Sequence, residues 1–126
     1  LGVEVSEQAA QSAAENAKLN NIENCKFIAG DAEKIFKEVD TPNELTTVIM
    51  DPSRKGSNQG FLKQLSEYKP KKIVYISCNV NTQARDIQYF LKETENGGVY
   101  EIDHVTGFDF FPQTHHVESV VVLTKK

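Results

Sequence analysis

Residues 47–56 have the sequence TVIMDPSRKG, in which a short apolar run leads directly into Asp-Pro and a polar turn. The uninterrupted, partly β-branched run 47–50 predicts a strand that is buried on both faces, as in parallel sheets. The proline fixes the backbone direction after the strand, so the Asp51 carboxylate is delivered at the edge of the sheet. Arg54 and Lys55 add positive charge that suits a phosphate or a polar base edge. The same residues also fit an ordinary Asp-Pro turn with two solvated bases.

Apolar runs alternate with amphipathic stretches along the rest of the chain. Strands are predicted at 2–5, 26–29, 47–50, 73–76, 99–105 and 117–123, and helical spacing follows each of the first four. This alternation predicts βα units and a mostly parallel sheet. The last two strands have no helical stretch between them, so we expect an antiparallel closing pair. In such α/β folds, ligands bind at the carboxyl ends of the strands.

The composition of the 126 residues, 39% hydrophobic and 25% charged, is typical of a globular domain. It excludes a disordered tail, a collagen-like fibre and a disulfide-stapled mini-protein. No apolar run approaches the ~20 residues of a membrane span, so no membrane partner is expected. The two cysteines have no CxxC or His-rich spacing, which favours an intracellular setting, first the cytoplasm, and no metal site. The net charge of −4 argues against strong electrostatic binding of nucleic acid by this stretch alone.

Polar residues follow the predicted strands directly. Glu4 is placed to accept hydrogen bonds from both hydroxyls of a ribose, although the residue taken alone is better explained as an exposed strand-end glutamate. Asp31 fits a helix N-cap, and a contact to an adenine is compatible with that role. Cys78 lies between Ser77 and Asn79, ahead of a helix whose dipole favours a thiolate nucleophile.

A buried structural cysteine is the alternative for Cys78, and it is the interpretation we adopt for Cys25. The segment 108–118, FDFFPQTHHVE, combines aromatic residues that core packing would explain with a polar cluster that it would not. Its adjacent histidines would point to opposite faces of a strand, which argues against a shared metal. Glu118 close to Cys78 would pair a nucleophile with a carboxylate base.

Three motifs in order give the chain a family resemblance. Residues 51–56 resemble an Asp-Pro-x-Arg-x-Gly motif, residues 76–86 a nucleophile motif, and residues 111–118 a Phe-Pro-x-Thr-x-His-x-Glu motif. Over essentially its whole length the chain resembles the C-terminal part of the S-adenosylmethionine-dependent RNA uracil-5-methyltransferases, in particular the fungal members that modify the T-loop uridine of tRNA. Ser53 and Val80 stand where the family often has proline, and neither position carries chemistry.

The resemblance implies a Rossmann-like methyltransferase fold that is incomplete at its N-terminus, with a Gly-rich loop, a first strand and an RNA-binding region preceding Leu1. It also implies methyl transfer from S-adenosylmethionine to carbon 5 of a tRNA uridine, with base flipping. A non-catalytic scaffold or RNA-binding fragment, and methylation of ribosomal RNA, are the alternatives.

The resemblance also assigns roles to single residues. Cys78 would add to carbon 6 of uracil, and Glu118 would remove the proton from carbon 5. Asp51 would hold the cofactor or uracil side of the pocket, and Arg54 would assist in placing the RNA. On the cofactor side, Glu4 would bind the ribose, and Asp31 would lie near the adenine.

Overall fold

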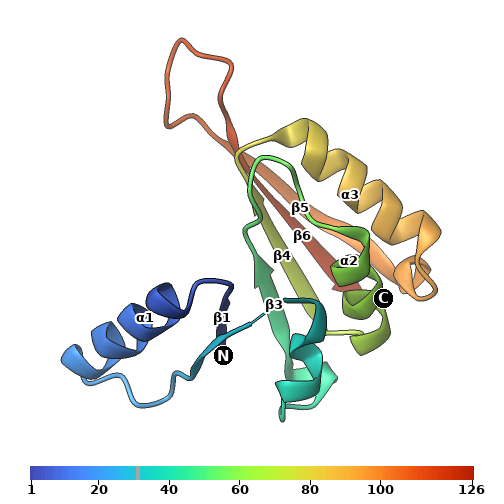
Figure 1. Ribbon diagram of the computed structural model, residues 1–126. Coiled ribbons are helices and arrows are strands. Elements are labelled where there is room, and N and C mark those ends of the chain that lie inside the picture. Colours follow the sequence, from blue (N-terminus) through green and yellow to red (C-terminus); the bar gives the residue numbers. More distant parts are fainter. Residues whose placement is uncertain (31) are drawn as a thin grey trace. The chain divides into compact units, whose positions relative to one another are not determined.

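The computed structural model describes residues 1–30 and 32–126, with the side chains of 32–34 left aside, and it forms two compact units (Figure 1). The first unit is Leu1–Asp40 and the second is Thr41–Lys126. Both follow the predicted alternation of strands and helices. Among the described residues, no helix has the length and apolar character needed to cross a membrane.

The first unit contains a parallel strand pair and its connecting helix. Its elements are β1 (Gly2–Glu4), α1 (Glu7–Leu19), β2 (Phe27–Ala29) and the 3₁₀ helix η1 (Ala32–Glu38). The Ser6 hydroxyl accepts a hydrogen bond from the Ala9 amide at 3.3 Å, so it caps α1 as the sequence predicts. The prediction for Asp31 falls on a residue outside the described part of the chain.

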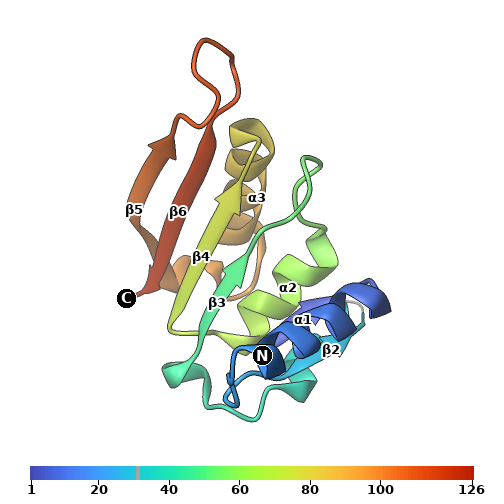
Figure 2. The ribbon, with the colours of Figure 1, turned by 90° about the vertical axis from the view of Figure 1, so that its left-hand side faces the viewer.

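The second unit is a four-stranded sheet with two helices. The strands are β3 (Thr47–Met50), β4 (Lys72–Ser77), β5 (Tyr100–Phe108) and β6 (Glu118–Lys125), in the order β3-β4-β6-β5. The helices are α2 (Gln59–Tyr68) and α3 (Val80–Glu93), with the 3₁₀ turns η2 (Asn43–Leu45) and η3 (Gly97–Val99). Figure 2 shows α2 and α3 on one face of this sheet.

The strand pairing makes the sheet mixed. β3 and β4 are parallel, whereas β6 runs antiparallel to both β4 and β5. The predicted antiparallel closing pair is therefore confirmed. Because β6 runs antiparallel to β4 and Ser119 pairs with Ser77, the start of β6 lies level with the carboxyl end of β4.

The core of the second unit lies between the sheet and its helices. Alternate residues of β4 are buried, and Ile73 and Tyr75 pack there with Leu65 of α2 and Phe90 of α3. The Tyr100 hydroxyl donates to the Pro70 carbonyl at 2.6 Å. Burial, and secondarily the charge of Glu44, raises the pKa of Tyr100 to about 12, so the hydroxyl remains a donor at neutral pH.

The prediction that the strand 47–50 is buried on both faces was wrong. Of its residues only Met50 is buried, and the Ile49 side chain is 68% exposed. The reason lies in the pairing, because within the described residues β3 pairs with β4 alone and forms an edge of the four-stranded sheet.

Candidate functional site

The β4–β6 ladder brings the second and third motifs side by side. Ser77 at the end of β4 pairs with Ser119 near the start of β6. Cys78 directly follows Ser77, and Glu118 directly precedes Ser119, so the antiparallel register places these two residues opposite each other. The predicted nucleophile, just after β4, and the predicted base, at the start of β6, therefore lie at the same level of two neighbouring strands.

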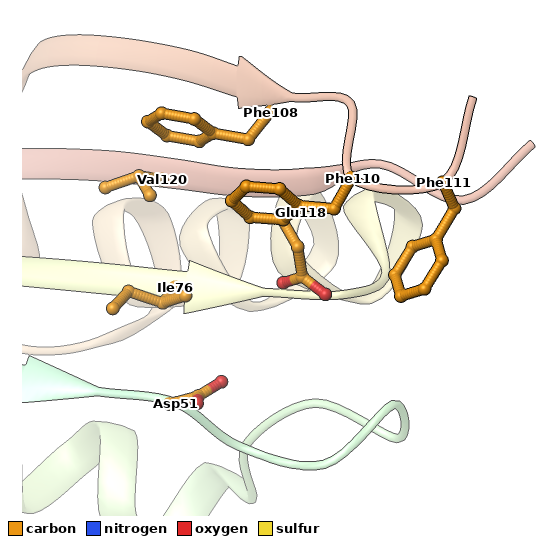
Figure 3. A pocket seen from close by; sticks show the side chains of 7 residues that line it. All are labelled: Asp51, Ile76, Phe108, Phe110, Phe111, Glu118 and Val120. Atoms are coloured by element: carbon orange, nitrogen blue, oxygen red, sulfur yellow. The ribbon is translucent and has the colours of Figure 1, made fainter.

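The parallel β3–β4 ladder adds the first motif. Met50 pairs with Tyr75, and Asp51 follows Met50 at the carboxyl end of the strand. Asp51 and Glu118 border one cavity of about 570 Å³, a size that suits a small molecule or a nucleobase. The cavity is lined by Asp51, Ile76, Phe108, Phe110, Phe111, Glu118 and Val120. Figure 3 shows the two carboxyl groups pointing toward one another from either side of β4.

Three phenylalanines form the aromatic wall of this cavity. The rings of Phe108 and Phe110 are stacked, with centroids 5.8 Å apart and planes at 12°. The Phe111 ring meets the His116 ring edge-on, with centroids 6.5 Å apart. Core packing does not explain these rings, because Phe110 is 66% and Phe111 55% exposed. An exposed aromatic wall beside two carboxylates provides a surface on which a planar, polar-edged ring can stack.

Cys78 lies in a turn that its neighbours hold in shape. The Ser77 hydroxyl donates to the Asn79 carbonyl and accepts from the Asn79 amide, both at 3.0 Å. The Asn79 side chain caps α3 and accepts from the Asn81 amide at 3.1 Å. The Cys78 thiol is half-buried. Among the described residues, those that line the cavity include Ile76, two positions before Cys78, but not Cys78 itself.

Arg54 joins the first motif to the other two. Its Nη2 atom lies 3.4 Å from His116 Nδ1, and arginine can only donate in this contact. Its carbonyl accepts from Asn79 Nδ2 at 3.2 Å and from Thr82 Oγ1 at 3.1 Å. Arg54 therefore contacts the start of α3 through its backbone carbonyl and His116 through its guanidinium.

Two sequence interpretations need correction here. His115 and His116 precede β6 rather than lying within it, and their ring centroids are 4.2 Å apart instead of on opposite faces. Within the described part of the chain, no three His, Cys, Asp or Glu side chains gather closely enough to hold a metal ion. Cys25 was interpreted as buried, but its side chain is exposed in the segment before β2.

The remaining predicted residues belong to the first unit. Glu4 ends β1, its side chain is exposed, and its carbonyl accepts from the Gly30 amide at 2.9 Å. Glu4 thus lies at the carboxyl end of a parallel strand, where ligands of α/β folds bind. The sequence analysis attributed Phe108 and Phe110 to core packing, whereas both rings are exposed and line the cavity. Their signal was three aromatic residues within four positions, placed beside a proline and a polar cluster.

Comparisons with known proteins identify a family that matches the whole chain. The family model described as tRNA (Uracil-5-)-methyltransferase matches residues 1–126. A tRNA (uracil(54)-C(5))-methyltransferase of Saccharomyces cerevisiae is 59% identical over 99% of the chain, and one of Schizosaccharomyces pombe is 55% identical over 99%. The chain spans only 20% and 24% of the length of these relatives.

A solved structure supports the fold. The tRNA (uracil-54, C5)-methyltransferase of Pyrococcus abyssi, in complex with S-adenosyl-L-homocysteine, superposes with a TM-score of 0.76 at 32% identity. The match covers 98% of this chain and 28% of that one. With a family model that matches every residue, a Rossmann-like fold and three motifs meeting at one strand edge, the chain belongs to the tRNA (uracil-5-)-methyltransferase family.

Proposed function

We propose that residues 1–126 are the C-terminal portion of the catalytic domain of a longer enzyme, which methylates carbon 5 of a uridine in the T-loop of tRNA. The observation that carries this proposal is the cavity bordered by Asp51, Glu118 and the aromatic wall, at the strand end from which Cys78 emerges. A flipped uracil fits such a cavity, because its ring can stack on phenylalanine while its polar edge meets a carboxylate.

The cofactor we propose is S-adenosylmethionine, the methylated form of the molecule bound by the Pyrococcus abyssi relative. When bound, it supplies an electrophilic methyl group on a sulfonium sulfur. The exposed Glu4 carboxylate, at the carboxyl end of β1, has the two acceptor oxygens that a ribose diol requires. Asp31 is assigned to the adenine side, and Asp51 to the methyl-transfer side of the uracil cavity.

The chemistry follows from the low nucleophilicity of carbon 5 in uracil. The Cys78 thiolate adds to carbon 6, and the electron pair of the 5,6 double bond makes carbon 5 the attacking atom. Once carbon 5 carries the methyl group, the Glu118 carboxylate removes its remaining proton. The electrons of that C–H bond re-form the double bond, and the bond between carbon 6 and sulfur breaks to return the thiolate. Arg54 helps to place the RNA beside Cys78.

The substrate we propose is tRNA, because both yeast relatives carry names that specify uracil 54 of tRNA. An intracellular, cytoplasmic enzyme agrees with such a substrate. A non-catalytic RNA-binding role would not require a cysteine and a glutamate at opposed positions of the β4–β6 ladder. Ribosomal RNA is the substrate that the experiment must distinguish.

The test is methylation by the complete enzyme of two RNAs, a tRNA transcript and a ribosomal RNA fragment, with methyl-labelled S-adenosylmethionine. We expect labelled 5-methyluridine in the tRNA, and none when the T-loop uridine is replaced by cytidine. Label in the ribosomal fragment alone would show that the substrate is ribosomal RNA and not tRNA. Absence of 5-methyluridine from both RNAs would refute the proposed activity.

A further inference from the structure

The loop that carries Arg54 is bound at successive backbone groups by side chains from the start of α3. Asn79 and Thr82 donate to the Arg54 carbonyl at 3.2 and 3.1 Å, and Arg85 Nη2 donates to the Lys55 carbonyl at 2.9 Å. Two residues after Lys55, the Ser57 amide donates to Asp86 Oδ2 at 2.6 Å. Four side chains from residues 79–86 therefore hold residues 54–57, which belong to no strand or helix.

Asp86 is the buried end of this set of contacts. Its side chain is only 3% exposed, and it also accepts from the Tyr75 hydroxyl at 2.7 Å and from Arg85 Nη2 at 2.7 Å. Burial raises the pKa of Tyr75, and the Asp86 carboxylate adds to this effect, so the hydroxyl stays a donor. A buried carboxylate that accepts from a backbone amide, a tyrosine hydroxyl and a guanidinium is held in one position, a fixed point in the fold.

Gly56 shows how closely the loop approaches this fixed point. Its φ of +80° lies in the left-handed region that favours glycine. A Cβ atom there would lie 2.5 Å from Asp86 Oδ2 and 2.6 Å from Arg85 Nη2. The glycine in the first motif is therefore matched to an aspartate and an arginine in the second.

We propose that Asn79, Thr82, Arg85 and Asp86 form a latch whose task is to position the Arg54 guanidinium for the reaction at Cys78. This inference rests on the proposed function. The first latch residue, Asn79, directly follows Cys78 and donates to the Arg54 carbonyl. The Arg54 side chain in turn lies 3.4 Å from His116 Nδ1. The four side chains are positioning residues, because they act through Arg54.

Thr82 offers a test that keeps the fold intact. Thr82→Val removes the hydroxyl and keeps the shape, whereas Thr82→Ser restores the donor, and Thr47→Val at an exposed position of β3 is the matched control. In the complete enzyme, we expect Thr82→Val to slow covalent capture of 5-fluorouridine tRNA roughly 10- to 100-fold. Binding of the RNA should change less than about 2-fold. Thr82→Ser should recover most of the rate.

A double-mutant cycle with Arg54→Ala separates positioning from a general structural role. If the latch acts through the guanidinium, Thr82→Val should cost little further rate when Arg54 is already alanine. An equal loss in both backgrounds would overturn the proposal, and so would an unchanged rate in Thr82→Val. If the wild-type enzyme captured no fluorinated RNA, the proposed function itself would fail, which is a different result.

Hydrogen exchange gives a readout that needs no reaction. Asp86→Asn weakens the acceptor of the Ser57 amide, so exchange of residues 54–57 should accelerate at least about tenfold relative to wild type. Asp103→Asn, at an exposed position of β5, is the control and should leave the loop protected. Unchanged protection of the loop in Asp86→Asn would show that the carboxylate does not hold it.

Discussion

Glu118 stands at the first position of β6, half-buried between the aromatic wall and the end of β4. Its neighbour Ser119 is paired with Ser77, so the backbone that carries this carboxylate is fixed on the Cys78 side by the ladder. A side chain anchored in this way is suited to remove a proton from a ring that is itself tethered to Cys78.

Replacing Glu118 by glutamine should separate methyl transfer from product release. Glutamine keeps the shape but cannot take the carbon 5 proton, so a methylated covalent complex with tRNA should accumulate while turnover falls at least about 100-fold. Denaturing gel electrophoresis of enzyme with labelled tRNA measures the complex. Glu101→Gln on exposed β5 serves as control. Normal turnover by the Glu118 variant would remove it from the role of base.

Phe110 is the most exposed ring of the aromatic wall and stacks on Phe108. Phe110→Ala should weaken binding of T-loop RNA, because stacking of a base on an aromatic side chain contributes about 1–3 kcal/mol. Phe110→Tyr keeps the ring and should bind nearly as wild type.

Fluorescence titration of a labelled T-loop hairpin gives the affinities. Leu45→Ala, which removes an exposed apolar side chain from η2, provides the comparison. Equal affinities for Phe110→Ala and the Leu45 variant would show that the wall does not stack bases.

At the scale of elements, the β3–α2 loop depends on backbone geometry that only glycine supplies. Gly56→Ala should lower the free energy of unfolding by about 1–3 kcal/mol, because alanine at this φ is strained and its Cβ collides with Asp86. Thermal and urea unfolding of the complete enzyme measure the loss.

Gly98→Ala is the matched glycine control, since nothing lies within 4 Å of a Cβ atom at that position. If the two variants were equally stable, the close approach of the loop to Asp86 would have no energetic weight.

The elements were largely predictable because their signals are local. Thr47–Met50 forms a strand with the bounds read from its apolar run, and Ser6 caps α1 through a bond three residues away. Burial was less predictable, because it depends on partners distant in sequence. Ile49 is exposed because β3 lies at a sheet edge, which the apolar run 47–50 cannot reveal.

The candidate site divides in the same way. Cys78, Glu118 and Asp51 were proposed from motif and strand end, and the pairing of Ser77 with Ser119 explains why Cys78 and Glu118 lie at the same level of neighbouring strands. The latch was not predicted, because the bond from Asp86 to the Ser57 amide joins residues 29 positions apart. The aromatic wall was assigned to the core, since its exposure depends on how the 108–118 segment leaves the sheet.

At the scale of the whole chain, its net charge and its share of the relatives' length bear on the proposed binding of RNA. The chain has a net charge of −4 and spans 20–24% of the length of its yeast relatives. Arg54, whose carbonyl accepts from Asn79 and whose guanidinium lies close to His116, is the cation beside the site that we propose contacts the RNA. We propose that Cys78 forms the covalent bond to the uracil.

The most direct measurement is to map the covalent bond. The complete enzyme is incubated with S-adenosylmethionine and a T-loop RNA that contains 5-fluorouridine. Because fluorine replaces the hydrogen on carbon 5, no proton can be removed there and the covalent complex is trapped. The complex is then digested, and the peptide that carries the nucleotide is sequenced by mass spectrometry. Cys25→Ala, at an exposed cysteine, is the control and should be trapped like wild type. We predict that the nucleotide is attached to the Cys78 sulfur and that Cys78→Ala forms no complex. A complex formed by Cys78→Ala, or a nucleotide attached to any other residue, would show that Cys78 is not the nucleophile.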